Sequence, residues 1–144
     1  MTGNQKLSFD VRSSWISHQE SISYCESSGK NASIKLDTNL QGTVDAFNPA
    51  ELLLSAISAC MIKGAERVAP ILKFSFRGIE VRLHGIRQDV PPKMESISYE
   101  IVVDTDEPDH RLELLHTNIK QYGTVFNSVA AGTNLHGKIT RKLV

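Results

Sequence analysis

The stretch Asn48-Pro-Ala-Glu-Leu-Leu-Leu-Ser-Ala-Ile-Ser-Ala-Cys60 is the strongest helix signal in the chain. Asn48 is a good N-cap residue, and Pro49 suits the first helical position, where its missing N–H has no cost. Glu51 lies three residues after the cap, so its carboxylate can accept from the backbone N–H of Asn48. The pattern predicts a capping box and therefore a helix that begins at Pro49.

We predict that this helix continues to about Val68 and that Pro70 helps to end it. Its first three turns are apolar on nearly every side, which predicts burial on every side. A sheet would cover one side, and another helix or a second subunit would cover the other. Ala56, Cys60 and Gly64 are small and recur every four residues, which favours close approach of a second helix along this seam.

Period-two alternation on both sides of the helix predicts strands. A turn cluster at 26–31 separates two of them, and helical spacing of apolar residues predicts a second helix whose C-terminal cap is Gly123. The expected strands cover residues 7–11, 22–24, 32–36, 79–83, 97–103 and 137–144, and the further helical segments cover 112–119 and 126–131. Strands and helices are segregated, so the predicted class is α+β with mostly antiparallel pairing, in a single domain over residues 1–144.

Composition excludes several classes of function. The chain has 144 residues, with 16 Lys and Arg against 16 Asp and Glu, so it lacks the basic surface of a nucleic-acid binder. The most apolar stretch without charge, Leu52–Ile62, is too short to span a membrane, which needs about 20 residues. The N-terminal residues contain no signal-peptide core, so we expect a cytoplasmic protein with neither a membrane nor a nucleic-acid partner.

The chain has two cysteines, Cys25 and Cys60, which argues against a disulfide framework. No group of Cys and His has the spacing of a metal site, and the five histidines are scattered, so we expect no metal. Cys60 has two interpretations. It is a nucleophilic thiol, or it is a small apolar residue that packs in the helix seam.

The segment from Asn48 to Cys60 resembles the central-helix signature of the OsmC/Ohr family. The strand Glu80-Val-Arg-Leu83 and the segment Tyr122-Gly-Thr-Val-Phe-Asn-Ser128 are similar to later parts of the same family. The resemblance implies an OsmC-like α+β fold in which antiparallel sheets wrap around a long central helix, in a domain-swapped homodimer.

The resemblance also implies a reaction. Cys60 would be the peroxidatic cysteine that reduces organic hydroperoxides in the defence against oxidative stress, and its thiolate would become a sulfenic acid. In the family a second cysteine then forms a disulfide with it, and an external thiol reduces that disulfide. The expected partners are a second copy of the chain, a hydroperoxide and a thiol reductant, with no metal or organic cofactor.

The sequence departs from the family pattern at three positions. The resolving cysteine falls on Gly123, and the first glutamate of the family's pair falls on Ala50, so Glu51 matches only the second. The family's N-terminal arginine has no clear counterpart, since Arg12 and His18 merely lie in that region. These departures favour an alternative function, a dimer that binds a small molecule without catalysis.

Other residues are candidates to support Cys60. Cys25 could replace the resolving cysteine, but the favoured interpretation is an incidental strand residue, because a disulfide needs Cα atoms within about 7 Å. Lys63 and Arg67 lie on the helix face of Cys60, and side chains on a helix lean toward its N-terminus, so Lys63 could reach back to the thiol. Solvated cations at the polar end of the helix are the alternative. Glu51 is already explained by its capping role.

Overall fold

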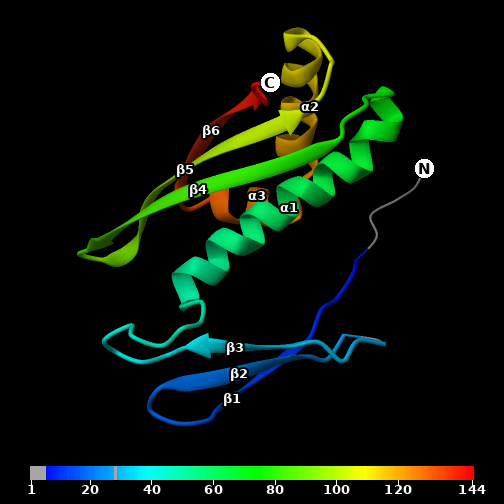
Figure 1. Cartoon of the computed structure of the whole chain (residues 1–144). Helices are drawn as coiled ribbons and strands as arrows, with labels where there is room; N and C mark the ends of the chain where they lie inside the picture. The colour runs from blue at the N-terminus through cyan, green and yellow to red at the C-terminus, as the bar shows by residue number, and fades with distance from the viewer. Residues whose placement is uncertain (1–5, 28) are drawn as a thin grey trace. The chain divides into compact units, whose positions relative to one another are not determined.

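The computed structural model describes residues 6–27 and 29–144 (Figure 1). The chain divides into two compact units, one up to Leu52 and the other from Leu53 onward. Residues 1–5, which belong to the segment where we expect no signal-peptide core, lie outside the described residues. Ser28 of the predicted turn cluster lies outside them as well. Within the described residues, no helix is both long enough and apolar enough to cross a membrane.

The first unit holds three antiparallel strands in the order β1–β2–β3, namely β1 (Val11–Trp15), β2 (Glu20–Cys25) and β3 (Ser33–Asp37). Two of the three predicted strands in this region are confirmed, but the predicted strand at 7–11 is wrong in its bounds. The register explains the difference. Val11 lies opposite Cys25, where β2 ends, so residues 7–10 lie beyond the end of the partner strand.

Helix α1 (Pro49–Leu72) begins as predicted, with the capping box formed in both directions. The Asn48 backbone N–H donates to Glu51 Oε1 at 3.0 Å, and the Glu51 N–H donates to Asn48 Oδ1 at 2.8 Å. The prediction that Pro70 ends the helix is wrong, because Pro70 lies inside the last turn. The chain leaves the helix at Lys73, which has a φ of 53°.

The end of α1 is a Schellman motif. The Phe74 N–H donates to the Ala69 carbonyl at 2.9 Å, and the Lys73 N–H donates to the Pro70 carbonyl at 3.3 Å. A proline in the last turn still loses one hydrogen bond of the helix, because it has no N–H. The left-handed Lys73 therefore ends the helix, and the carbonyls of the last turn find partners beyond it.

The second unit holds the sheet β4 (Gly78–Asp89), β5 (Pro92–Asp104) and β6 (Asn134–Arg141), with helices α2 (Asp109–Tyr122) and α3 (Thr124–Ala130) between β5 and β6. The α+β class is confirmed, and β4 pairs antiparallel to β5. However, β6 pairs parallel to β5. The two helices carry the chain back to the starting end of β5, as a parallel connection requires.

The core of the second unit lies between α1, α2, α3 and the sheet. Its fully buried side chains come from α1, β5 and α2, and they are Ile57, Met61, Ile97, Ile101, Val103, Leu115 and Ile119. The seam predicted on α1 is partly filled from within this unit. A Cβ built on Gly64 would lie 3.7 Å from the Ile119 Cα atom of α2, which is ordinary contact distance.

The expected burial of α1 on every side is wrong for the single chain. Ile62 and Ile71 of α1 are 39% and 75% exposed, respectively. The side of the helix between them packs into the core through Ile57 and Met61. Ile62 and Ile71 are nine residues apart and so lie on opposite sides of α1, where the sheet and the neighbouring helix leave each of them exposed.

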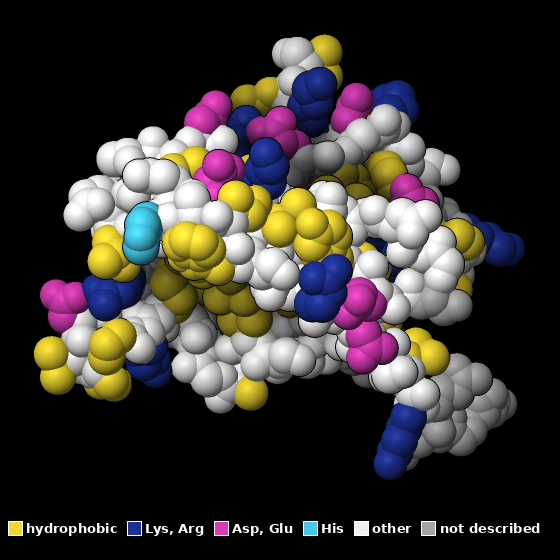
Figure 2. Space-filling model, turned by 90° about the horizontal axis from the view of Figure 1, so that it is seen from below, with side chains coloured by type: hydrophobic (Ala, Val, Ile, Leu, Met, Phe, Trp, Pro, Cys, Tyr) yellow, Lys and Arg dark blue, Asp and Glu magenta, His cyan; other side chains and the backbone are white. Residues whose placement is uncertain are grey.

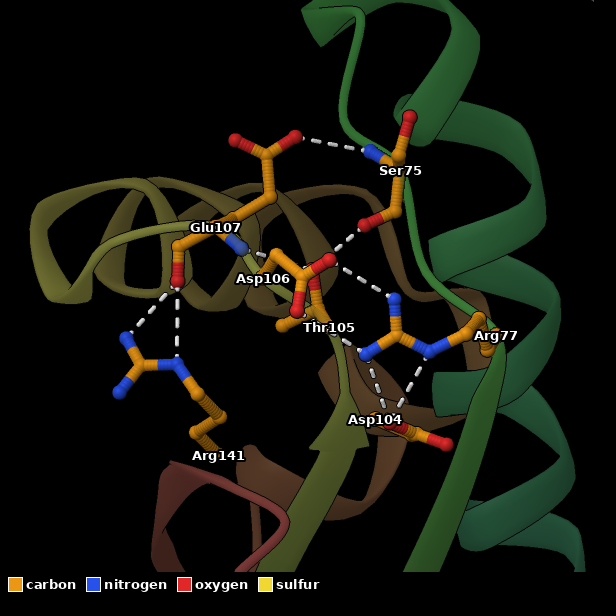
Figure 3. A network of polar contacts seen from close by, with 7 residues as sticks. All are labelled: Ser75, Arg77, Asp104, Thr105, Asp106, Glu107 and Arg141. Carbon is orange, nitrogen blue, oxygen red and sulfur yellow. Dashed lines mark hydrogen bonds and ion pairs between the residues drawn. The ribbon is translucent and has the colours of Figure 1, made fainter. Parts of the chain in front are cut away.

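A polar network joins the start of β4 to the segment between β5 and α2, as Figure 3 shows. Arg77 forms ion pairs with Asp104 at 3.0 Å and Asp106 at 3.1 Å. Thr105 Oγ1 donates to the Ser75 carbonyl at 2.5 Å. Exposed ion pairs contribute little to stability, so the effect of the network is to hold these two segments in place. They border a pocket of about 300 Å³.

Candidate functional site

Cys60 lies in α1, and its side chain is half-buried against the junction between α2 and α3. A Cβ built on Gly123, the residue that joins these helices, would lie 3.2 Å from Cys60 Sγ. The same point is 3.0 Å from Phe126 Cβ and 3.1 Å from the Ile119 carbonyl oxygen. Glycine at position 123 therefore leaves a narrow space beside the sulfur, slightly tighter than a Cβ atom ordinarily needs, which we call the Gly123 gap.

The backbone does not require glycine at this position. Gly123 has φ −83° and ψ 113°, an extended conformation that any residue adopts. The prediction of Gly123 as the C-cap of α2 is confirmed in position, but its backbone is extended rather than left-handed. The family resemblance places the resolving cysteine at this position. The structure places Gly123 next to Cys60, so the residue beside the Cys60 sulfur carries no thiol.

Arg67 binds the same junction from α1. Its Nη1 donates to the Tyr122 carbonyl oxygen at 3.3 Å. That carbonyl belongs to the last turn of α2, where the helix dipole favours a cation. Lys63 is exposed on α1. The predicted effect of Lys63 and Arg67 on the thiol stays a prediction, and the structure adds a second role for Arg67.

The other candidate residues belong to the first unit, whereas Cys60 belongs to the second. Glu51 is held in the capping box. The ring of His18 lies edge-to-face with Trp15 at 5.4 Å. Cys25 is half-buried at the end of β2, and both cysteines are free thiols. Support of Cys60 by Glu51, His18 or Cys25 stays a prediction.

Sequence reasoning missed a buried polar pair near the Gly123 gap. Tyr99 of β5 and His116 of α2 are each about 5% exposed, and the Tyr99 hydroxyl and His116 Nε2 are 2.7 Å apart. Burial raises the pKa of Tyr99 to about 12, and burial lowers the pKa of His116 below its ordinary value. Both groups are therefore neutral near pH 7. The alternation in β5 marked Tyr99 as buried, but nothing in the sequence pointed to its partner.

The ring of Tyr99 connects this pair to the Gly123 gap. It lies edge-to-face with His116 at 5.7 Å and with Phe126 of α3 at 6.2 Å. Phe126 in turn borders the gap. Within the described residues, no three His, Cys, Asp or Glu side chains are placed to hold a metal ion. The chemistry that this arrangement can support is therefore that of one half-buried thiol beside a small gap.

Known structures share this fold. An OsmC-like protein from Mycoplasma pneumoniae superposes with a TM-score of 0.86 at 14% identity, over 96% of this chain and 100% of that one. An organic hydroperoxide resistance protein OsmC from Legionella pneumophila gives 0.69 at 14% identity, over 95% and 99% of the two chains. OhrB, the organic hydroperoxide resistance protein of Bacillus subtilis, gives 0.63 at 13% identity, over 92% and 98%.

No curated protein matches the sequence. At these identities the structural likeness shows the fold alone. The model of the OsmC-like protein family matches residues 41–136, which include α1, the sheet strands β4 and β5, and both helices at the Gly123 gap. The chain therefore belongs to the OsmC-like protein family.

Proposed function

We propose that this protein is a cysteine-based peroxidase that reduces organic hydroperoxides at Cys60, in the cytoplasm and at the expense of a thiol. The observation that carries the proposal is the Gly123 gap beside a half-buried Cys60 Sγ. A side chain at position 123 would press on the sulfur, and glycine removes that contact, so an oxygen atom bonded to Cys60 requires the neighbouring atoms to yield by only a few tenths of an ångström. Two solved relatives of the same fold are organic hydroperoxide resistance proteins.

The reaction begins with the Cys60 thiolate. It attacks the terminal oxygen of the hydroperoxide, so an S–O bond forms as the O–O bond breaks. The alkoxide leaves and takes a proton to become an alcohol. An external thiol then attacks the sulfenic acid, releasing water and forming a mixed disulfide with Cys60. A second thiol then attacks the external sulfur of this mixed disulfide, so the bond to Cys60 breaks, the two external thiols leave as a disulfide and Cys60 is restored as its thiolate.

An external thiol is proposed because position 123 carries no resolving cysteine. Cys25 is the other thiol of the chain, but it lies in the first unit and matches no family motif. Small thiols are kept reduced in the cytoplasm, which supplies the reductant that the scheme needs.

We also propose that the protein is a homodimer. Helix α1 exposes the apolar side chain of Ile62, and the first unit by itself exposes large apolar side chains, including Trp15 at 69% and Leu40 at 97%. Figure 2 shows several exposed hydrophobic side chains in the view from below. Apolar patches of this kind mark interfaces between proteins. A second copy of the chain is the proposed occupant.

The second candidate function is a dimer that binds a small molecule without catalysis. The observation that favours it is the same Gly123, because a disulfide cannot form between residues 60 and 123. In that case Cys60 would line the binding site as an apolar residue, and the gap would accept part of the ligand.

Hydroperoxide consumption decides between the two functions. The wild type is incubated with tert-butyl hydroperoxide and dithiothreitol, beside the variants Cys60→Ser and Cys25→Ser. The peroxidase proposal expects turnover in the wild type, loss of turnover in Cys60→Ser, and nearly unchanged turnover in Cys25→Ser. Cys60 that stays a free thiol in intact-mass spectra after excess hydroperoxide would refute the peroxidase and leave the binding function.

A further inference from the structure

The α2–α3 junction and Phe126, which together form the wall that faces Cys60, are held in place from two directions. On one side, Phe126 borders the Gly123 gap, and its ring packs on Tyr99, whose hydroxyl is bonded to His116. On the other side, Arg67 binds the Tyr122 carbonyl, one residue before Gly123. Both sets of contacts converge on the α2–α3 junction, and neither includes the sulfur itself.

The position of the Tyr99 ring is fixed both by packing against β6 and by a hydrogen bond of its hydroxyl. Tyr99 lies opposite Gly137 of β6 in the parallel register. A Cβ built on Gly137 would collide with the Tyr99 ring, so the ring occupies the space that a side chain at 137 would take. The buried hydroxyl then needs a hydrogen-bond partner, because an unpaired polar group in the core is costly. His116 is that partner, and the bond locks the ring angle on which Phe126 rests.

The Gly123 gap has no spare room for movement of this wall. The three nearest atoms are 3.0 to 3.2 Å from its centre, which is already a close contact for a carbon atom. A shift of a few tenths of an ångström by Phe126 or the junction would change whether an atom fits beside Cys60 Sγ. The accessibility of the thiol is therefore sensitive to contacts that do not touch it.

We propose that Tyr99, His116 and Arg67 are positioning residues that hold the α2–α3 junction at a fixed distance from Cys60 and so set the rate at which its sulfur reacts. The inference deepens the proposed peroxidase. The Tyr99–His116 bond fixes Phe126, and Arg67 fixes the backbone before Gly123. Loss of either contact lets the junction move into the gap and slows attack by Cys60 on any reagent.

The test uses Tyr99→Phe, which keeps the ring and removes the hydroxyl, and two substitutions at His116. His116→Leu removes the partner, while His116→Gln retains a group that can bond the Tyr99 hydroxyl. Tyr122→Phe is the matched control, because its ring is 53% exposed and only its backbone carbonyl is used. The readout is the rate of Cys60 alkylation by iodoacetamide and by bulkier N-ethylmaleimide in a Cys25→Ser background.

We expect Tyr99→Phe and His116→Leu to slow alkylation by about tenfold, since a displacement of about 1 Å near a reacting group costs up to about a hundredfold in rate. The bulkier reagent should lose more. His116→Gln and Tyr122→Phe should stay near the wild-type rate. All variants should react equally fast in denaturant, which separates access to the sulfur from its intrinsic chemistry.

Arg67 gives a second route that does not disturb the core, because its side chain is exposed. Arg67→Ala should slow alkylation, and Arg67→Lys should recover part of the rate. Wild-type rates for folded Tyr99→Phe and Arg67→Ala with both reagents would overturn the inference. Wild type that consumes no hydroperoxide while these variants still slow alkylation would refute the peroxidase and leave the positioning role standing.

Discussion

Gly123→Cys should form a disulfide with Cys60, although the natural chain has none. The built Cβ at position 123 lies 3.2 Å from Cys60 Sγ. In a relaxed disulfide, with an S–S bond of about 2.04 Å, the Cβ lies about 3 Å from the far sulfur. The two positions therefore agree to within a few tenths of an ångström. The extended backbone of Gly123 accepts a cysteine without strain.

The size of the effect follows from the loop that the disulfide closes. Residues 60 and 123 are separated by roughly 60 residues, and the chain-entropy relation gives about 4 kcal/mol of stabilisation for a loop of that length. Part of this is offset because the new Cβ and sulfur must displace Phe126 Cβ, which is 3.0 Å away. We therefore expect the free energy of unfolding to rise by about 2–4 kcal/mol on oxidation.

The assay compares urea unfolding of Gly123→Cys in its oxidised and reduced forms, with intact mass to confirm the loss of two hydrogens. Gly132→Cys is the matched control, since a Cβ built there meets nothing within 4 Å. Free thiols at both position 60 and position 123 after mild oxidation would refute the placement of the α2–α3 junction beside Cys60. The oxidised variant should also be unreactive toward hydroperoxide until a dithiol reduces it.

Three further predictions concern packing, assembly and pH. Gly64→Leu should lower the free energy of unfolding by about 1–3 kcal/mol, because Ile119 already lies at contact distance, whereas the exposed Ala32→Leu should change it by less than about 0.5 kcal/mol in urea titrations. Sedimentation at micromolar concentration should show a dimer, and a folded monomer would contradict the proposed burial of Ile62 by a second copy of the chain. Burial lowers the pKa of His116 from the ordinary 6.5, so the unfolded chain binds its proton first. The free energy of unfolding should therefore fall as the pH drops below about 6.5, and His116→Gln should lose this part of the pH dependence in unfolding curves measured from pH 5 to 8.

The start of α1 was predictable because its cause is local. Asn48, Pro49 and Glu51 lie within one turn, and the capping box forms from those residues alone. The end of the helix was not predictable in the same way. Pro70 is accommodated in the last turn of α1, and the helix ends at the next residue after Leu72, Lys73, which adopts a left-handed conformation despite its Cβ. A lysine at position 73 is not a sequence signal for a left-handed helix end.

The candidate site was predictable only in part. The helix signature identified Cys60 and the family resemblance pointed to Gly123, but the contacts that join them to β5 and α3 come from residues far away in the sequence. The relation between Gly123 and Cys60 depends on how α2 packs on α1, and the Tyr99–His116 bond depends on the sheet placing Tyr99 under α2. An influence of Arg67 on the thiol stays a prediction, and the structure adds its hydrogen bond to the Tyr122 carbonyl. Such long-range contacts leave no periodic pattern.

The parallel pairing of β6 has a consequence for the order of folding. The β4–β5 hairpin closes locally, with Asp89 opposite Pro92, so its loop-closure entropy is small. The β5–β6 pairing joins Ile97 to Leu135 across two helices, and it cannot form until α2 and α3 have docked. Until then the backbone groups along the edge of β5 that pairs with β6 are unpaired, so another chain can pair with them. We expect the docking of α2 and α3 to limit the completion of the sheet. Substitutions at the α2–α3 junction should therefore increase aggregation during refolding, in addition to changing the reactivity of Cys60.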